Sequence, residues 1–470
     1  MGQTRRHALE SMEGSQGCAI ILGRAGTHPL INLFPSIMVS RQRTYAGKIL
    51  PHKMAPYLET EHQAERNGGL MAAISLPVTL SPAAIQLSES VITLRRTLHQ
   101  WPELGFQEQR TSTLIAQQLA AMGLEVKTGI ARTGVLGILH GNAPGKTVLL
   151  RADIDGLPIE EASGAPYTSQ NHGVMHACGH DGHTAILLTV AKLLTERRGE
   201  LSGTVKFAFQ PAEELPPGGA KGMIEEGVLE NPKVDAVFGL HLWNGLPVGR
   251  IGVDQGPIMA SVDRFEILIK GVGSHGAYPH AGVDPIVIGS HVVTALQTVV
   301  SREVPPLAPV VVTVGEFHGG TAFNVIPSHA TLSGTVRTVD ARIRHEMPDR
   351  LERVVRGVTS GMRAEYTFDY EFGYPVTVNN ADKAKFAWGV ATGIVGEANV
   401  VPAGMTMGAE DMSYFLEAVP GCYLRLGSGN AEKGLIHPHH SALFNFDESA
   451  LPIGVELLAQ ITLACLRERD

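Results

Sequence analysis

The stretch TVLLRADID, residues 147–155, begins as an apolar run and ends in charged side chains. Two later segments have the same form, VKFAFQPAEE at 205–214 and AVFGLHLWN at 236–244. In each segment a β-prone run leads directly into acidic or imidazole residues, and none of the three begins with them. In open α/β sheets, binding sites form beyond the carboxyl ends of the strands. The pattern therefore predicts strands of one such sheet with a polar site at their ends.

The flanking sequence favours an α/β fold with largely parallel strands. Short apolar runs alternate with helical segments from about residue 82 onward. One predicted helix is TSTLIAQQLAAMG, with Thr111 as its N-cap and Gly123 just past its end. Another predicted helix covers residues 450–467.

Residues 258–375 differ from the flanking sequence in the order of their strand and helix signals. Their signals follow in the order strand, helix, strand, strand, helix, strand, which is the order of ferredoxin-like α+β domains. We therefore expect this segment to be a small domain inserted into a larger one. The larger domain would then be discontinuous and consist of residues 81–257 and 376–470.

Length and composition limit the classes of protein to which this chain can belong. A chain of 470 residues is too long for one core and predicts two or three domains. The formal charge of −8 argues against a nucleic-acid binder, because neutralising phosphates needs a basic surface. No apolar run reaches the roughly 18 residues that a membrane span requires. Four cysteines are too few for a disulfide scaffold, which favours a reducing compartment such as the cytoplasm.

The first 80 residues differ from the rest. Residues 1–56 contain seven Lys/Arg and two acidic residues, and they show no sustained helix or strand period. We expect a disordered extension over residues 1–80. A transit peptide is the alternative, because such peptides share this bias toward basic residues.

Candidate metal ligands collect near the predicted strand ends. MHACGHDGH, residues 175–183, contains Cys178 and His180 two positions apart in a glycine-containing loop. Further candidates follow the strands or lie near the C-terminus: Glu213, Glu214, His241 and the histidines of HPHH at 437–440. Borderline divalent ions accept imidazole, thiolate and carboxylate together. Five such ligands exceed one tetrahedral ion and predict two ions that share a bridging ligand.

The adjacent glutamates Glu213 and Glu214 are predicted to have different roles. One would bind metal, and its neighbour would take a proton from a water molecule and later deliver it to the leaving group. Other polar residues would lie behind the ligands and orient or support them: Asp153, Asp155, His176 and His183.

Each feature also has a simpler structural interpretation. A buried cysteine usually fills space in a core, which is what we expect of Cys18, Cys422 and Cys465. The imidazoles beside Cys178 favour ligation instead, and they fit fellow ligands better than a base that activates a thiol nucleophile. An adjacent acid pair usually faces solvent, but here the pair follows a strand directly.

Taken in order, the motifs resemble those of the M20 metallopeptidase superfamily. The resemblance covers residues 82–468 and is carried by LRRTLHQWPELGFQE, LLRADIDGLPIEE, MHACGHDGHTA, FQPAEE, GLHLWN, GSHGAYPHAGVDP, GTAFNVIPSHATLSGTVRT and GAEDMSYF. The chain is most similar to the amidohydrolase branch, which includes hippurate hydrolases, N-acyl-amino-acid amidohydrolases and plant auxin-conjugate hydrolases. Residues 1–80 take no part in the resemblance.

This resemblance implies roles for particular residues. It implies a general base at Glu213 and five metal ligands: Cys178, His180, Glu214, His241 and one C-terminal histidine. Counting back from the Leu-Pro pair that follows places the last ligand at His440. Ala442 stands where relatives often have proline, so His439 and His437 remain alternatives.

The inserted domain acts in relatives as a lid and often as a dimerisation surface, so the resemblance implies a homodimer or homotetramer. Within it, His275 resembles a histidine that helps to polarise the scissile carbonyl, and the structural alternative is a histidine in a glycine-rich turn. Asn324 and Arg337 resemble groups that hold the substrate's carboxylate or oxyanion. An arginine can hold a carboxylate through two N–H groups.

The predicted protein is a cytoplasmic amidohydrolase that uses two divalent ions (Mn, Co, Ni or Zn) to split an N-acyl amino acid into a carboxylic acid and an amino acid. The expected partner is that small molecule, with no nucleic acid or membrane. One alternative is a metallo-dipeptidase or aminopeptidase, against which Cys178 argues because peptidase branches have a carboxylate there. The other is a non-catalytic amino-acid binder, against which the retained Glu213 and Glu214 argue.

Overall fold

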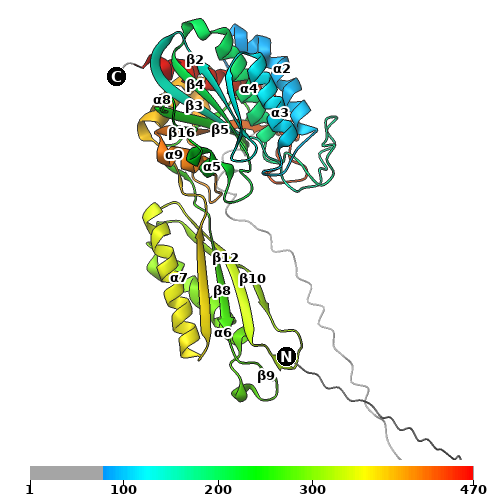
Figure 1. The fold of residues 1–470 in the computed structure, drawn as a ribbon, viewed down its shortest axis with the longest axis vertical. Coiled ribbons are helices and arrows are strands. Elements are labelled where there is room, and N and C mark those ends of the chain that lie inside the picture. Colours follow the sequence, from blue (N-terminus) through cyan, green and yellow to red (C-terminus); the bar gives the residue numbers. More distant parts are fainter. Residues whose placement is uncertain (1–77, 469–470) are drawn as a thin grey trace, which may run out of the picture. The chain divides into compact units, whose positions relative to one another are not determined.

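The computed structural model describes residues 78–468. Most of the extension predicted over residues 1–80, together with its transit-peptide alternative and Cys18, therefore lies outside the described residues. Within the described range, a larger and a smaller sheet each pack against helices (Figure 1). The predicted class, an α/β fold with an α+β segment inserted along the chain, is confirmed.

The larger sheet has eight strands within the described residues. Across the sheet they run in the order β1 (Glu125–Ile130), β2 (Gly134–His140), β4 (Ser202–Gln210), β3 (Ala143–Asp153), β5 (Ala236–Pro247), β16 (Gly421–Gly429), β6 (Ile251–Gly252) and β15 (Val400–Val401). The central strands β4, β3, β5 and β16 are parallel, whereas β1–β2, β2–β4 and β16–β6 are antiparallel pairs. The three sequence segments that end in polar residues form β3, β4 and β5. Because these strands are neighbours, their carboxyl ends meet at one edge of the sheet.

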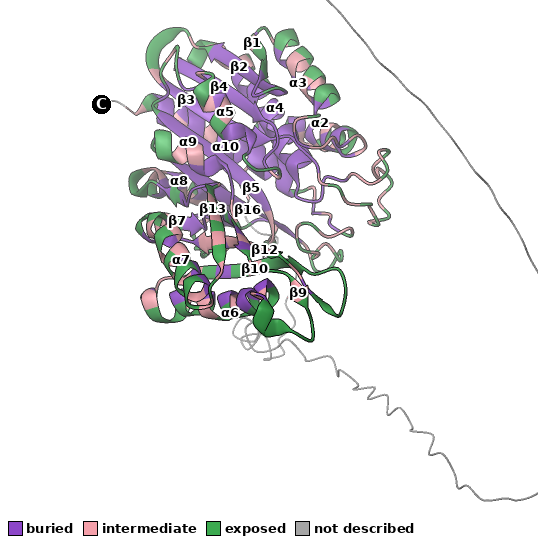
Figure 2. Cartoon of the chain, turned by 60° about the horizontal axis from the view of Figure 1, so that its bottom comes forward, coloured by how far each residue is buried: buried purple, intermediate pink, exposed green. Residues whose placement is uncertain are grey.

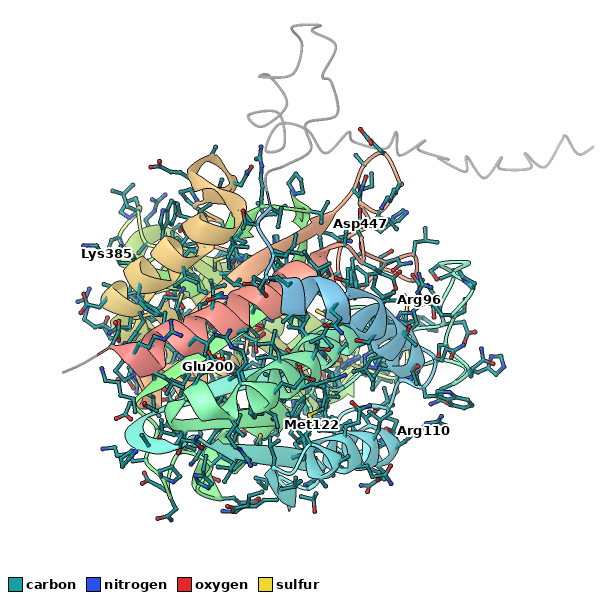
Figure 3. The ribbon with its side chains drawn as sticks, turned by 90° about the horizontal axis from the view of Figure 1, so that it is seen from above. Arg96, Arg110, Met122, Glu200, Lys385 and Asp447 are labelled. Carbon is teal, nitrogen blue, oxygen red and sulfur yellow. The ribbon has the colours of Figure 1, made fainter. Side chains whose placement is uncertain are left out.

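Helices cover both faces of this sheet. They are α2 (Pro82–His99), α3 (Gln109–Ala121), α4 (His180–Glu196), α5 (Gly219–Glu225), α8 (Ala381–Val395), α9 (Met412–Ala418) and α10 (Ala450–Arg467). Leu149 faces α5 and α9, whereas Val148 and Leu150 face the layer formed by the other helices. In that layer α10 lies beside α2, α4 and α8 (Figure 3). Single helical turns occur at Arg198–Glu200, Pro279–Ala281, Val299–Glu303 and Glu397–Asn399.

The start of α3 differs from the prediction. The helix begins at Gln109, and Thr111 lies in its first turn instead of capping it. The carboxylate of Glu103, in the preceding loop, accepts hydrogen bonds from the N–H groups of Arg110 and Thr111 at 3.0 and 2.9 Å. A distant carboxylate thus satisfies the N–H groups that an N-cap side chain would otherwise bind. Gly123 adopts φ +76° just past the helix, as predicted.

The smaller sheet is antiparallel throughout. Its order is β10 (Val310–Gly319), β12 (His329–Thr338), β8 (Asp263–Lys270) and β13 (Glu365–Phe372). Along the chain, α6 (Pro285–Thr298) follows β8 and α7 (Ala341–Gly361) follows β12, which gives the predicted β-α-β-β-α-β order. The limits 258 and 375 of an inserted domain stay a prediction.

The two faces of the smaller sheet differ in burial. Phe265 and Ile267 pack against α6 and α7, whereas Arg264, Thr335 and Arg337 lie on the opposite, more open face. Figure 2 shows the contrast with the buried strands of the larger sheet. Two short pairs complete the strands: β9 (Ser274–His275) with β11 (Val325–Ile326), and β7 (Gly256–Met259) with β14 (Thr377–Asn379).

Helix α10 is, among the described residues, the one helix that is long and apolar enough to cross a membrane by length and composition. Most of it is buried within the fold, against α2, α4 and α8. Buried core helices pass the same test, so its composition matches its place in the core.

Candidate metal centre

The predicted ligands meet at the carboxyl ends of β3, β4 and β5. Glu213 and Glu214 follow β4, His241 lies within β5, and His180 is the first residue of α4. Gly179, between Cys178 and His180, adopts φ +88°, which glycine tolerates far better than other residues. The chain therefore turns sharply between the sulfur and the imidazole, and both reach the same region.

Two triads of ligand atoms share one sulfur. Cys178, His180 and His241 form one, and Cys178, Glu214 and His440 form the other; within each, the ligand atoms lie within 4.8 Å of one another. The Cys178 Sγ lies 3.5 Å from His241 Nε2, and His440 Nε2 lies 3.1 Å from Glu214 Oε1. The structure thus brings all five predicted ligands together. The Cys178 sulfur is common to both triads.

The backbone of Leu242 fixes the orientation of three imidazoles. Its carbonyl oxygen accepts hydrogen bonds from His241 Nδ1 at 2.6 Å and from His439 Nε2 at 2.9 Å. Its N–H donates to His183 Nε2 at 2.9 Å. A carbonyl only accepts and an N–H only donates, so these contacts assign the proton on each ring. His241 is left with a free lone pair on Nε2, the atom that faces Cys178.

His183 cannot serve as a ligand in this arrangement. Its Nε2 accepts from the Leu242 N–H, so its Nδ1 carries the proton and donates to Asp153 Oδ1 at 2.6 Å. Both ring nitrogens are therefore in use. This geometry agrees with the outer position expected for His183 and Asp153.

His180 presents a buried nitrogen with no partner. Its Nδ1 contacts the Asp155 carbonyl oxygen at 3.0 Å and the Asp155 Oδ1 at 3.2 Å. Its Nε2 is buried and has no hydrogen-bond partner among the described residues, although Asp153 Oδ2 lies 3.6 Å away and Glu214 Oε1 4.0 Å away. Leaving a buried polar atom unsatisfied is costly. A divalent cation would engage this lone pair, so the donor set fits such an ion.

The electrostatics of the cluster also fit bound cations. Burial and then the Glu214 and Glu213 carboxylates raise the pKa of the Cys178 thiol well above its usual range. Burial, with Glu410 and Glu214 nearby, likewise raises the pKa of Glu213. Burial and then His183 lower the pKa of His241, which keeps this imidazole in its neutral, metal-binding form. Cations at this position would offset the negative charge and favour the thiolate of Cys178.

The three C-terminal candidates differ in their surroundings. His440 belongs to a ligand triad, and its backbone N–H donates to the Ala177 carbonyl oxygen at 2.8 Å. His439 packs on His241, and burial lowers the pKa of His439 to about 4. His437 belongs to none of the ligand groups among the described residues. The geometry therefore favours His440 as the last ligand.

A cavity of about 340 Å³ opens beside the ligands. All the triad residues except His180 line it, and its walls also include Glu213, Trp243, Arg337, Tyr374 and Glu410. Arg337 is half-buried and is the one predicted lid residue that reaches this cavity. A larger cavity of about 710 Å³, beside the C-terminal end of α10, contains none of the ligands.

The other two predicted lid residues do not reach this cavity. His275 and Asn324 are exposed and lie beside each other, because the Gly276 N–H donates to the Asn324 carbonyl oxygen at 2.8 Å. His275 Nδ1 accepts from the Ala277 N–H at 3.0 Å, within the glycine-rich turn. In this structure His275 therefore has the surroundings of a histidine in a glycine-rich turn.

A buried network behind the cluster was not predicted from the sequence. Arg151 donates to Asp153 Oδ2 at 2.7 Å, and to Glu410 Oε1 and Asp411 Oδ1 at 2.8 Å each. Tyr423 donates to Glu410 Oε2 at 2.8 Å. The motifs RADID and GAEDMSYF contain Arg151 and its three carboxylate partners, but not Tyr423. Only the pairing of a strand arginine with a distant acid pair could have indicated the network.

A model of the family described as Peptidase family M20/M25/M40 matches residues 149–464. The chain belongs to this family. An N-acyl-L-amino acid amidohydrolase from Geobacillus stearothermophilus is 46% identical over 294 residues, which cover 63% of this chain and 79% of that protein. Thermostable carboxypeptidase 2 from Saccharolobus solfataricus is 41% identical over 383 residues, 81% of this chain and 95% of that protein.

A solved structure is similar over most of the chain. The YXEP protein of Bacillus subtilis, described as a dinuclear metal binding peptidase from the M20 family, superposes with a TM-score of 0.71 at 36% identity. The match covers 81% of this chain and 99% of that one. This M20/M25/M40 family member is therefore a metal-dependent hydrolase that acts on amide bonds.

Two matched substitutions distinguish the C-terminal histidines. We expect His440→Gln to lower the bound divalent metal by about half, because one of the two triads loses a ligand. His437→Gln should leave the metal content unchanged. Elemental analysis of each purified variant measures the ratio of metal to chain. Loss of metal from the His437 variant alone would reassign the last ligand.

Proposed function

We propose that this chain hydrolyses N-acyl amino acids to a carboxylic acid and a free amino acid. The observation that carries the proposal is the Cys178 sulfur common to two ligand triads beside a cavity that also contains Glu213 and Arg337. The name of the Geobacillus stearothermophilus relative supports the same reaction.

Two divalent ions are the proposed cofactors. Cys178, His180, Glu214, His241 and His440 would hold them, and Mn, Co, Ni and Zn all suit a set with thiolate, imidazole and carboxylate. When bound, such ions make water acidic and withdraw electrons from a substrate carbonyl. Asp155 and the Leu242 backbone would keep the imidazoles in the ligating orientation.

Glu213 is the proposed general base. It is 7% exposed, lines the cavity, and is adjacent in sequence to the ligand Glu214. Burial and the nearby Glu410 raise the pKa of the Glu213 carboxyl, which strengthens it as a proton acceptor. In the reaction it would accept a proton from the attacking water and deliver it to the nitrogen of the leaving amino acid.

Arg337 is the proposed partner of the substrate's carboxylate. It lies on β12, on the open face of the smaller sheet, and it lines the same cavity as Cys178, Glu214, His241 and His440. A guanidinium can donate two parallel hydrogen bonds to a carboxylate. This contact would set the amide bond of an acyl amino acid against the ligands. His275 and Asn324 would act only after the inserted segment changes position or from a second copy.

A cytoplasmic location is part of the proposal. Cys178, Cys422 and Cys465 are free thiols and buried in the described structure. Free thiols persist in reducing compartments.

Replacing Glu213 tests its role directly. Glu213→Gln should retain bound metal but lower kcat on N-acetylmethionine by about a thousandfold, because general base catalysis contributes about 10²–10⁴. Glu225→Gln, at an exposed glutamate of α5, is the matched control and should keep full activity. A normal rate in the Glu213 variant would rule it out as the base.

A peptidase is the second candidate, favoured by the name of the Saccharolobus solfataricus relative. Chelated enzyme should regain activity when Mn, Co, Ni or Zn is returned. We expect the restored enzyme to release amino acid faster from N-benzoylglycine and N-acetylmethionine than from free-amino dipeptides. The opposite order of kcat/KM would favour the peptidase.

We also propose a homodimer or homotetramer formed through the smaller sheet. β10 is an edge strand, and Leu307, Val311 and Phe323 expose apolar side chains near it. Unpaired edge strands are ready templates for pairing with another chain. Sedimentation should therefore give at least twice the chain mass of 50.2 kDa, and Val311→Asp should reduce it. A wild-type monomer at micromolar concentration would contradict this assembly.

A further inference from the structure

The turn that contains Glu213 and Glu214 belongs to no helix or strand. It directly follows β4, and Ala212 adopts φ +52°, in the left-handed region that residues with side chains rarely enter. Such a turn lacks the repeated backbone hydrogen bonds of a ladder or helix. Its conformation must be held by contacts from other parts of the chain.

Side chains from three separate segments hold three successive residues of this turn. Each contact joins one side chain to one backbone group: Glu108 Oε1 to the Ala212 N–H at 2.9 Å, Tyr374 Oη to the Glu213 carbonyl oxygen at 2.7 Å, and Asp155 Oδ2 to the Glu214 N–H at 3.0 Å. Of the three, only Tyr374 bonds to the proposed base itself.

Tyr374 lies where the chain returns from the smaller sheet to the larger one. It is located between β13 and β14, and its carbonyl oxygen accepts from the N–H of Val262, which lies between β7 and β8, at 3.0 Å. The two connections between the sheets are thus hydrogen-bonded side by side. The Tyr374 ring is buried and meets the Tyr414 ring edge-on at 6.2 Å.

The loop that contains Glu213 and Glu214 contacts Tyr374 a second time, at Gly218. Gly218, five residues after Glu213, adopts φ +77°. A Cβ on Gly218 would lie 3.0 Å from the Tyr374 ring and hydroxyl, and 2.3 Å from Asp411 Oδ2. A larger residue would therefore force the loop away from the tyrosine. Glycine allows the close approach by which the loop packs on Tyr374.

We infer that Tyr374 is a positioning residue for Glu213, and that its hydroxyl sets the direction in which the Glu213 carboxylate enters the cavity. The inference rests on the proposed role of Glu213 as the base. The Glu213 carbonyl oxygen and the Glu214 N–H belong to one peptide group, which Asp155 holds at the N–H and Tyr374 holds at the oxygen. The tyrosine contact therefore completes the restraint on this peptide plane and on the direction of the Glu213 Cα–Cβ bond. A displacement of about 1 Å in a reacting group can lower a rate by about 100-fold.

A pair of tyrosine-to-phenylalanine substitutions tests this inference. Tyr374→Phe removes the hydroxyl and keeps the ring that packs on Tyr414 and Gly218. We expect it to lower kcat on N-acetylmethionine about tenfold, with KM within about twofold and bound metal unchanged. Tyr414→Phe is the matched control, because its hydroxyl donates to the Gly373 carbonyl oxygen at 3.1 Å in the same connection. It should keep kcat within about twofold of wild type.

A double variant separates positioning from general damage. In Glu213→Asp the carboxylate is already displaced, so adding Tyr374→Phe should lower kcat by less than about threefold. A full tenfold further loss would mean that Tyr374 acts by another route and would overturn the inference.

The remaining outcomes separate this inference from the proposed function. Wild-type kcat in Tyr374→Phe, beside an inactive Glu213→Gln, would overturn the role of Tyr374 alone. Equal losses in both tyrosine variants, with equal falls in melting temperature, would overturn it as well. Normal activity of Glu213→Gln would instead refute the proposed base.

Discussion

The carboxyl-end edge of the central sheet gathers more buried acidic side chains than buried arginines, and the rest of the site depends on that excess. Arg151 is buried at this edge, and the three carboxylates that accept its hydrogen bonds are Asp153, Glu410 and Asp411. Cys178 and Glu214 lie beside imidazoles instead, with His241 Nε2 at 3.5 Å from the Cys178 sulfur and His440 Nε2 at 3.1 Å from Glu214 Oε1. Burying charge without compensation is costly, so this edge is built for bound cations.

Around that edge, the protein controls which atom of each imidazole is available. The peptide groups on either side of the Leu242 Cα engage His183, His241 and His439, and Asp155 contacts Nδ1 of His180. Ligand orientation is therefore set largely by backbone groups of β5 and by a residue that follows β3. The turn that contains Glu213 and Glu214 is likewise held through its backbone, by side chains from distant segments. The positions of these side chains therefore depend on the sheet and the segments attached to it.

Part of the fold and of the candidate site could be predicted from the sequence. The strands could be predicted because β3, β4 and β5 each change from apolar to polar at one end. The candidate ligands could be named because thiol, imidazole and carboxylate are chemically distinctive, and the structure brings these candidates together. The N-terminus of α3 was placed wrongly because the capping carboxylate of Glu103 lies outside the helix. Tyr374 was missed because its hydroxyl acts on a carbonyl group 161 residues away, which leaves no local pattern. The position of His275 depends on how the inserted segment folds, which motif spacing does not encode.

The central claim is that Cys178, His180, Glu214, His241 and His440 would hold two divalent ions. Anomalous diffraction from crystals of the manganese-loaded enzyme, collected at the manganese absorption edge, tests it most directly. We expect two peaks per chain, both within bonding distance of the Cys178 sulfur, with His180, Glu214, His241 and His440 as the remaining protein ligands. Peaks located elsewhere, or none at this cluster in crystals of fully active enzyme, would contradict the account.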